Sequence, residues 1–156
     1  MENASKALIM AAAILIGIIV LSLGVYLFVT FGKSAAETEE QNRQTQIAQF
    51  NSQFTKYDKQ TDTTIYDILT VANLAQENNR NYGLNASNAN NQSSYYIYVY
   101  ANTNSGSTAD FTDFENNSTK MNAELLGNSE LQTYTCSVSI SPITGRVYKV
   151  NFEKNK

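Results

Sequence analysis

The stretch ALIMAAAILIGIIVLSLGVYLFVTFG, from Ala7 to Gly32, contains no charged residue. As an α-helix, its 26 residues would extend about 39 Å, more than the ~30 Å hydrocarbon core of a bilayer. A single segment satisfies its own backbone hydrogen bonds in lipid only when it is helical. The rest of the chain is too polar to bury this much apolar surface inside a soluble fold. We therefore expect residues 1–32 to form one transmembrane helix.

A cleaved signal peptide is the alternative reading of the same stretch. Ser34, Ala35 and Ala36 precede Glu37, and small residues in this arrangement suit a signal peptidase. A signal peptide, however, has an apolar core of only ~7–15 residues, which is much shorter than this one. The length favours a segment that is retained as an anchor.

The positive charges that flank the apolar stretch do not set its orientation. Lys6 lies on one side, and Lys33 and Arg43 lie on the other. The composition of the part that follows, rich in Asn, Ser, Thr, Gln and Tyr, is typical of a domain outside the cytoplasm. We expect a single-pass protein of the cell membrane with a cytoplasmic N-terminus and an extracytoplasmic C-terminal domain.

Small residues recur on one face of the predicted span. Ala13 and Gly17 form a small-xxx-small pair, and Gly24 falls on the same face two turns further on. Two such helices can approach closely along this face, so Ala13, Gly17 and Gly24 are candidate helix-association residues. Glycine and alanine are also common in membrane helices without any such role.

The span is expected to continue into a stalk helix over residues 33–57, since no Pro or Gly interrupts Ser34–Tyr57. Its first part is polar on all sides. Its second part carries one apolar stripe, made by Ile47, Phe50, Phe54 and Tyr57. That stripe predicts packing against a domain downstream.

Residues 58–156 are expected to form that extracytoplasmic domain. Thr64 and Asp67 resemble a capping box at the start of a second helix, which Gly83 ends. Alternating apolar residues predict three strands, over residues 95–100 and in a hairpin that turns at residues 141–145. A weaker helix is predicted from Asp110 to Gly127. The fold class is therefore α+β, with a small three-stranded antiparallel sheet packed against helices.

Composition excludes much chemistry. The chain has 11 basic and 14 acidic residues, no His and one Cys, and its net charge is −3. A negative chain with scattered cations does not suit nucleic-acid binding. Without His there is no partner to activate Cys136, which we expect to be a core residue. Acidic and amide residues from Asp110 to Asn117 could ligate Ca²⁺, but their spacing is not that of a calcium loop and helix capping explains them as well. We predict no enzyme, no catalytic residues, no cofactor and no metal.

Tyrosines dominate the clearest predicted strand. Tyr96, Tyr98 and Tyr100 would point to one face, and Tyr95, Ile97 and Val99 to the core. Tyrosine combines a large contact area with a polar tip, so the first three are possible partner-binding residues. They are equally compatible with ordinary strand-forming surface residues.

An apolar N-terminal helix continuing into a stalk, followed by a small sheet, resembles the type IV pilins and pseudopilins. The resemblance is carried by Ala7–Tyr57, Tyr95–Tyr100 and Thr133–Phe152, and it is one of architecture. In that family the apolar helices bundle in a filament core and the sheets face outward. The chain has no Gly before the apolar block and no Glu at its start, so no residue role carries over. Phe50–Asn79 also resembles a segment of small uncharacterised single-pass envelope proteins of Gram-positive bacteria.

The sequence thus indicates a single-pass, membrane-anchored cell-envelope protein with a structural or interaction role, as a pilin-like subunit or an accessory of an envelope assembly. Its expected partners are membrane lipid and either another protein or a second copy that associates through the transmembrane helix. The alternative is a membrane-anchored binding module that recognises a protein or a glycan through the tyrosine-rich strand face.

Overall fold

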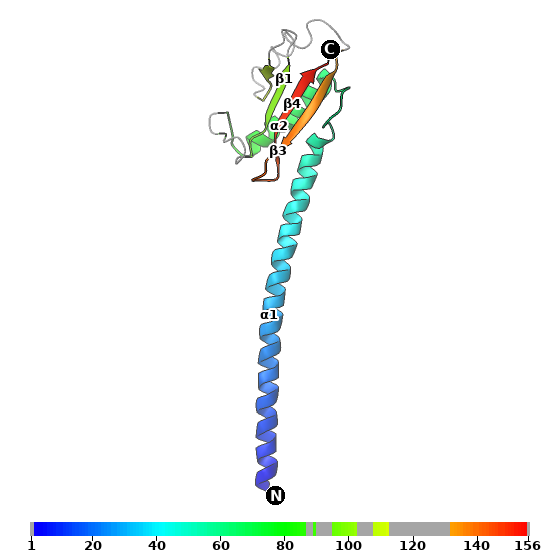
Figure 1. The fold of residues 1–156 in the computed structure, drawn as a ribbon. Helices are drawn as coiled ribbons and strands as arrows, with labels where there is room; N and C mark the ends of the chain where they lie inside the picture. The colour runs from blue at the N-terminus through cyan, green and yellow to red at the C-terminus, as the bar shows by residue number, and fades with distance from the viewer. Residues whose placement is uncertain (1, 87–88, 90–94, 103–107, 113–131, 156) are drawn as a thin grey trace. The chain divides into compact units, whose positions relative to one another are not determined.

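The computed structural model describes residues 2–86, 89, 95–102, 108–112 and 132–155. These residues form an α+β fold with two helices and four strands (Figure 1). In chain order the elements are α1 (Glu2–Thr55), α2 (Ile65–Asn81), β1 (Tyr98–Asn102), β2 (Thr108–Asp110), β3 (Tyr134–Ile140) and β4 (Val147–Lys154).

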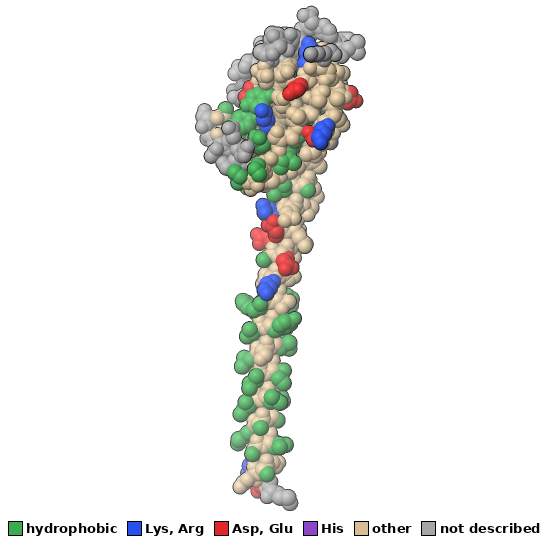
Figure 2. Space-filling view, viewed as in Figure 1, with side chains coloured by type: hydrophobic (Ala, Val, Ile, Leu, Met, Phe, Trp, Pro, Cys, Tyr) green, Lys and Arg blue, Asp and Glu red, His purple; other side chains and the backbone are tan. Residues whose placement is uncertain are grey.

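The chain divides into two compact units, Met1–Gln46 and Ile47–Lys156. In the first unit, the described residues form only helix, and their side chains are exposed. Its large apolar side chains are between 42% (Leu27) and 81% (Phe28) exposed. Figure 2 shows them as green groups along this part of α1. By length and composition, α1 is a candidate membrane span.

The uninterrupted helix expected from the apolar stretch through the stalk is confirmed, and it ends at Thr55. Two backbone hydrogen bonds between residues three apart then turn the chain. The N–H of Tyr57 donates to the carbonyl of Phe54 and the N–H of Asp58 donates to the carbonyl of Thr55, both at 3.0 Å. The second unit begins within α1, at Ile47. Residues in the last turns of the helix therefore belong to the packed part of the protein.

The sheet corrects the prediction in two respects. It has four strands in the order β2-β1-β4-β3, and it is mixed, because β1 runs parallel to β4 while the other two pairs are antiparallel. Apolar alternation fixes which face of a strand is buried, but it does not fix the neighbour or direction of that strand. β2 has only three residues, Thr-Ala-Asp, which are too few to show a period.

Other boundaries also differ from the prediction. The strand expected over residues 95–100 begins at Tyr98 and continues to Asn102. Asp110, expected to start a helix, is the last residue of β2. From residue 113 onward the expected helix lies outside the described residues.

Helix α2 has the ends that the sequence predicts. The Asp67 carboxylate accepts hydrogen bonds from the backbone N–H and the hydroxyl of Thr64, at 2.9 and 2.8 Å. At the other end, Gly83 adopts a positive φ of 62°. The N–H of Gly83 donates to the carbonyl of Arg80, and that of Leu84 to Asn79, as in a Schellman motif.

The core lies between α2, the end of α1 and one face of the sheet. Phe54 of α1, Ile68 of α2 and Val99 of β1 are fully buried, together with Val150 and Phe152 of β4. In the stripe expected on the stalk, Phe54 and Tyr57 are buried and Ile47 and Phe50 are half-buried. The end of α1 is therefore part of this core.

The outer edge of β3 is covered by the segment that follows α1. Thr63 and Tyr134 exchange two backbone hydrogen bonds of 2.8 and 3.2 Å, and Cys136 bonds to Lys59 and Gln60. The N–H of Val138, two residues further along the same edge of β3, donates a hydrogen bond to the Asp58 carboxylate at 2.9 Å. An edge closed in this way cannot add a strand from another chain along these residues.

One buried group provides a test of this packing. Tyr134 is fully buried, and within the described residues its hydroxyl has no hydrogen-bond partner. Leaving a buried hydroxyl unsatisfied costs about 1–3 kcal/mol.

We predict that Tyr134→Phe leaves the stability of the globular unit unchanged or raises it by about 1 kcal/mol. Thermal unfolding in micelles, followed through the near-UV circular dichroism of the tyrosines, measures this change. The control is Tyr66→Phe, since Tyr66 is 75% exposed. Clear destabilisation by Tyr134→Phe alone would show that the hydroxyl is hydrogen-bonded.

Candidate functional site

The tyrosines of β1 lie on the face that the sequence predicts, with two differences. Ile97 and Val99 are fully buried on the core side, while Tyr98 and Tyr100 are half-buried on the other side. Tyr96, which precedes the strand, is only 4% exposed. Tyr95, expected on the core face, is instead 44% exposed.

The three tyrosines form a ladder in which each ring packs against the next. The rings of Tyr98 and Tyr100 are stacked at 6.0 Å with an angle of 6°, and those of Tyr96 and Tyr98 meet edge to face at 4.7 Å. The ammonium of Lys149 lies 5.2 Å from the Tyr100 ring centre. The Tyr98 ring therefore contacts a neighbouring ring on each side. This arrangement does not leave a flat aromatic platform for a sugar.

Polar residues flank the ladder on the same face of the sheet. Tyr100 is paired with Asp110 of β2 on one side and with Asn151 of β4 on the other, and Tyr98 is paired with Lys149. Burial, followed by the negative charge of Asp110, raises the pKa of both tyrosine hydroxyls. The ladder therefore carries neutral hydroxyl groups among polar side chains and can form hydrogen bonds.

A second aromatic group surrounds Arg146, in the turn between β3 and β4. Its guanidinium carbon lies 3.9 Å from the ring centre of Phe50, 4.9 Å from Tyr95 and 5.2 Å from Tyr82. The guanidinium also donates to the Asn78 side-chain oxygen at 2.9 Å and to the Tyr82 hydroxyl at 3.1 Å. Arg146 thus joins the end of α1, the end of α2 and the start of β1. We call this group the Arg146 cluster.

The Arg146 cluster explains the exposed position of Tyr95, whose ring also packs on Tyr82 at 4.8 Å. A cation bound among aromatic rings is favourable by about 0.5–2 kcal/mol. Since the chain's own arginine occupies the aromatic faces, the cluster stabilises the fold and is not an open cage for a ligand. No sequence pattern pointed to it, because its rings come from three distant segments.

A pocket of about 400 Å³ lies at the C-terminal end of α2. It begins beside Tyr96, the first residue of the ladder, and Thr112 forms part of its wall. The other lining residues come from α2 and the turn that ends it: Gln76, Asn79, Arg80, Gly83, Leu84, Asn85 and Ala86. One feature of the sequence indicates this site: Gln76 and Arg80 are four residues apart, which places both side chains on one side of a helix.

The candidate association residues Ala13, Gly17 and Gly24 are exposed on α1. A Cβ added at Gly17 or at Gly24 would meet nothing within 4 Å. The surface at these glycines is therefore open to another helix. The association of two such helices is a prediction.

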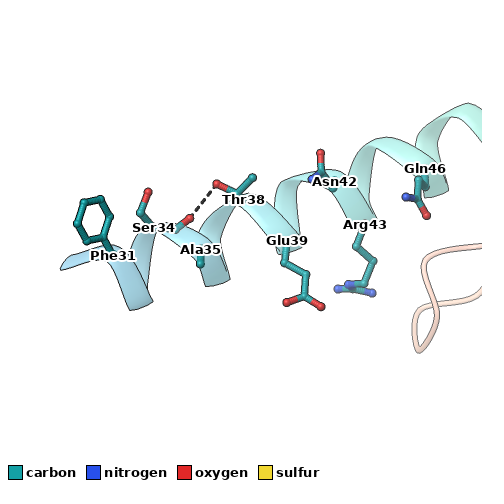
Figure 3. A pocket seen from close by; sticks show the side chains of 8 residues that line it. All are labelled: Phe31, Ser34, Ala35, Thr38, Glu39, Asn42, Arg43 and Gln46. Atoms are coloured by element: carbon teal, nitrogen blue, oxygen red, sulfur yellow. Dashed lines mark hydrogen bonds between the residues drawn. The ribbon is translucent and has the colours of Figure 1, made fainter. Parts of the chain in front are cut away.

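A shallow groove runs along α1 from Phe31 to Gln46 (Figure 3). The short side chain of Ala35 leaves room between longer neighbours, and the Thr38 hydroxyl donates to the carbonyl of Ser34 at 2.8 Å. Figure 3 shows the side chains diverging around the helix. A groove on one helix encloses nothing, so it does not form a small-molecule site.

The described residues were predicted to hold neither a metal nor a nucleophile, and two observations bear on these sites. The described residues contain no group of three or more metal-ligating side chains. Cys136 is 1% exposed, as expected of a core residue, and burial followed by the charge of Asp58 raises the pKa of its thiol to about 12. Such a thiol is not a nucleophile at neutral pH. Of the possible calcium ligands only Asp110 is described, and it bonds to Thr112.

Comparison with protein families, curated proteins and solved structures finds no match to this chain. The resemblance to pilins thus has no independent support from relatives. Any function must be argued from α1, the tyrosine ladder and the pocket.

The Arg146 cluster yields one prediction. Arg146→Met keeps an apolar stem but leaves Asn78 and Tyr82 without their charged donor. Hydrogen bonds to charged groups contribute about 1.5–3 kcal/mol, so we expect a loss of that size in the stability of the globular unit. Thermal unfolding in micelles measures it, with Lys33→Met, outside the globular unit, as the control. Equal stability of the two variants would show that the cluster contributes nothing.

A second prediction concerns Cys136, the one thiol of the chain. Its pKa is raised from 9.0 to about 12, so folding keeps it protonated. The unfolded thiol ionises near its ordinary value, hence the stability of the native state falls as pH rises from about 9 towards 12. Cys136→Ala should weaken this fall. At pH 8 we expect the native thiol not to react with a thiol reagent and the denatured thiol to react fully, and rapid native labelling would contradict its burial.

Proposed function

We propose that this is a single-pass, membrane-anchored protein of the cell envelope with a structural or interaction role, as a pilin-like subunit or an accessory of an envelope assembly. Its N-terminus lies in the cytoplasm, and the α+β unit lies outside. The proposed partners are membrane lipid and a second copy or another protein that associates through α1.

The observation that carries the anchor is the exposure of the apolar part of α1. Every large apolar side chain from Leu8 to Phe31 is at least 42% exposed. Burying a large aliphatic or aromatic side chain contributes about 1.5–3 kcal/mol, so leaving all of them in water is very unfavourable. Lipid provides the missing apolar surroundings. A signal sequence has a similar composition, and the retention of the segment is therefore part of the proposal.

Association through α1 is supported by the continuity of one helix face. Eighteen residues correspond to about five helical turns, so residues 18 apart lie on the same side of a helix. Phe31, Ala35 and Asn42 therefore lie on the same side of α1 as Ala13, Gly17 and Gly24. These three later residues line the groove on the stalk. One helix face therefore extends from the apolar part of α1 into its polar part, where Glu39 and Arg43 also line the groove. A second helix could follow this face beyond the membrane.

The second candidate function is a membrane-anchored binding module that uses the Tyr96, Tyr98 and Tyr100 face. It is favoured by the half-exposed ladder with polar residues on both sides. Since the rings pack on one another, recognition would use the hydroxyl groups and ring edges. That geometry suits a protein partner, or a glycan bound by hydrogen bonds instead of by stacking.

Two substitutions test the leading proposal. Gly17→Ile combined with Gly24→Ile fills the close-approach face of α1 and should convert oligomers in micelles to monomers, as measured by analytical ultracentrifugation. The matched control is Ala11→Ile combined with Gly32→Ile, which adds the same kind of bulk away from this face. We expect at least a tenfold weaker association for the first variant and little change for the control.

The two candidate functions predict different results in the same experiment. If the glycine variant associates like the native protein, α1 is not the association surface and the pilin-like proposal fails. The binding module then requires that a triple change of Tyr96, Tyr98 and Tyr100 to Phe reduce binding to isolated cell-envelope material. Binding that this change leaves intact would exclude the ladder hydroxyls.

A further inference from the structure

The polar groups that line the pocket at the end of α2 differ in whether they are already hydrogen-bonded within the fold. Some of the groups that line it are already used within the fold. The Asn79 side chain accepts from the N–H of Ile97 at 2.8 Å and donates to its carbonyl at 3.0 Å. The Thr112 hydroxyl accepts from the N–H of Val99 and donates to Asp110. Asn79 and Thr112 therefore form a fixed wall.

Two side chains remain that can donate hydrogen bonds into the pocket. Gln76 and Arg80 lie one turn apart on α2, and both line the pocket. Gln76 is half-buried and Arg80 is exposed. Among the lining residues that the structure describes there is no carboxylate, and Arg80 is their one charged member. A chain with a net charge of −3 thus places a positively charged side chain beside a concave surface.

Guanidinium and amide donors on one side of a helix match the oxygens of a carboxylate or a phosphate. The volume of about 400 Å³ is within the usual range of ligand pockets, ~300–1,000 Å³, and exceeds the need of a lone ion. Leu84, Ala86 and Tyr96 add apolar and aromatic surface to the polar side. Such surroundings suit a compact body, such as a sugar ring, that carries an anionic group.

We propose that the pocket at the C-terminal end of α2 binds an acidic monosaccharide, free or at the end of a glycan, with Arg80 and Gln76 donating to its carboxylate or phosphate. This goes beyond the proposed function, since it requires neither association through α1 nor hydroxyl groups from the whole tyrosine ladder. It assigns the globular unit a ligand of its own.

The test is a titration of the ¹⁵N-labelled full chain in neutral micelles, followed by NMR shifts of the backbone amides around Gly83. The probes are glucuronate, glucose, inorganic phosphate and short acidic oligomers of galacturonate. We expect saturable shifts with glucuronate and at least tenfold weaker binding of glucose, which lacks the anionic group. Tighter binding of the oligomers than of glucuronate would identify a glycan end as the ligand, and equal binding would identify the free sugar.

Substitutions connect the binding to the named residues. Arg80→Gln should weaken glucuronate binding at least tenfold, because it removes the charge-assisted bonds. Gln76→Ala should weaken it severalfold, whereas Asn73→Ala, an exposed change elsewhere on α2, should not. The spectra themselves report whether each variant is folded.

Three results would overturn the proposal. They are the absence of saturable shifts with glucuronate and with the oligomers, equal binding of glucuronate and glucose, and native affinity in both Arg80→Gln and Gln76→Ala. Binding of inorganic phosphate as tight as that of glucuronate would also contradict it, since the site would then recognise any anion and no sugar. None of these results changes the oligomer sizes measured for the α1 variants, so the two proposals fail independently.

Discussion

The large apolar side chains of the first half of α1 are exposed, and no described residue of the chain covers them. About two dozen consecutive residues without a charge form a helix that already satisfies its own backbone. Their side chains remain uncovered, and the second unit has a complete core of its own, made by α2, the sheet and Phe54. The proposed lipid surroundings would satisfy both facts. The proposed anchor, the proposed association along α1 and the proposed extracytoplasmic position of the α+β unit all depend on this requirement.

The last turns of α1 have a different role, because they are part of the folded unit. Phe54 is fully buried in the core, and Phe50 stacks under Arg146. The side-chain oxygen of Asn51 accepts a hydrogen bond from the N–H of Val147 at 2.9 Å, and its side-chain nitrogen donates to the carbonyl of Gly145 at 2.7 Å. One helix thus includes both the candidate span and part of the core. The α+β unit cannot lose the end of α1 without losing packing, hydrogen bonds and the cation among the aromatic rings.

The sequence predicted the elements whose signals are local. The long helix follows from the uncharged apolar stretch Ala7–Gly32 and from the absence of Pro and Gly between Ser34 and Tyr57. The ends of α2 follow from Thr64, Asp67 and Gly83. Sheet order was beyond it, because a period of two gives the face of a strand and not its neighbour. The Arg146 cluster was missed for a similar reason, since Phe50, Tyr82 and Tyr95 show no shared pattern. For the tyrosine ladder, the face of Tyr98 and Tyr100 agrees with the prediction, whereas Tyr96 is nearly buried and Tyr95 is exposed. The contacts between the rings depend on side-chain packing, which the alternation does not give.

Extraction of native membranes tests the requirement for lipid most directly. After cell breakage, membranes are washed with alkaline carbonate, and the protein is located by immunoblotting and its intact mass determined. The proposed anchor requires that the protein remain in the washed membranes with its apolar segment still attached. Recovery in the soluble fraction, either as the full chain or as a product that begins near Glu37, would contradict it.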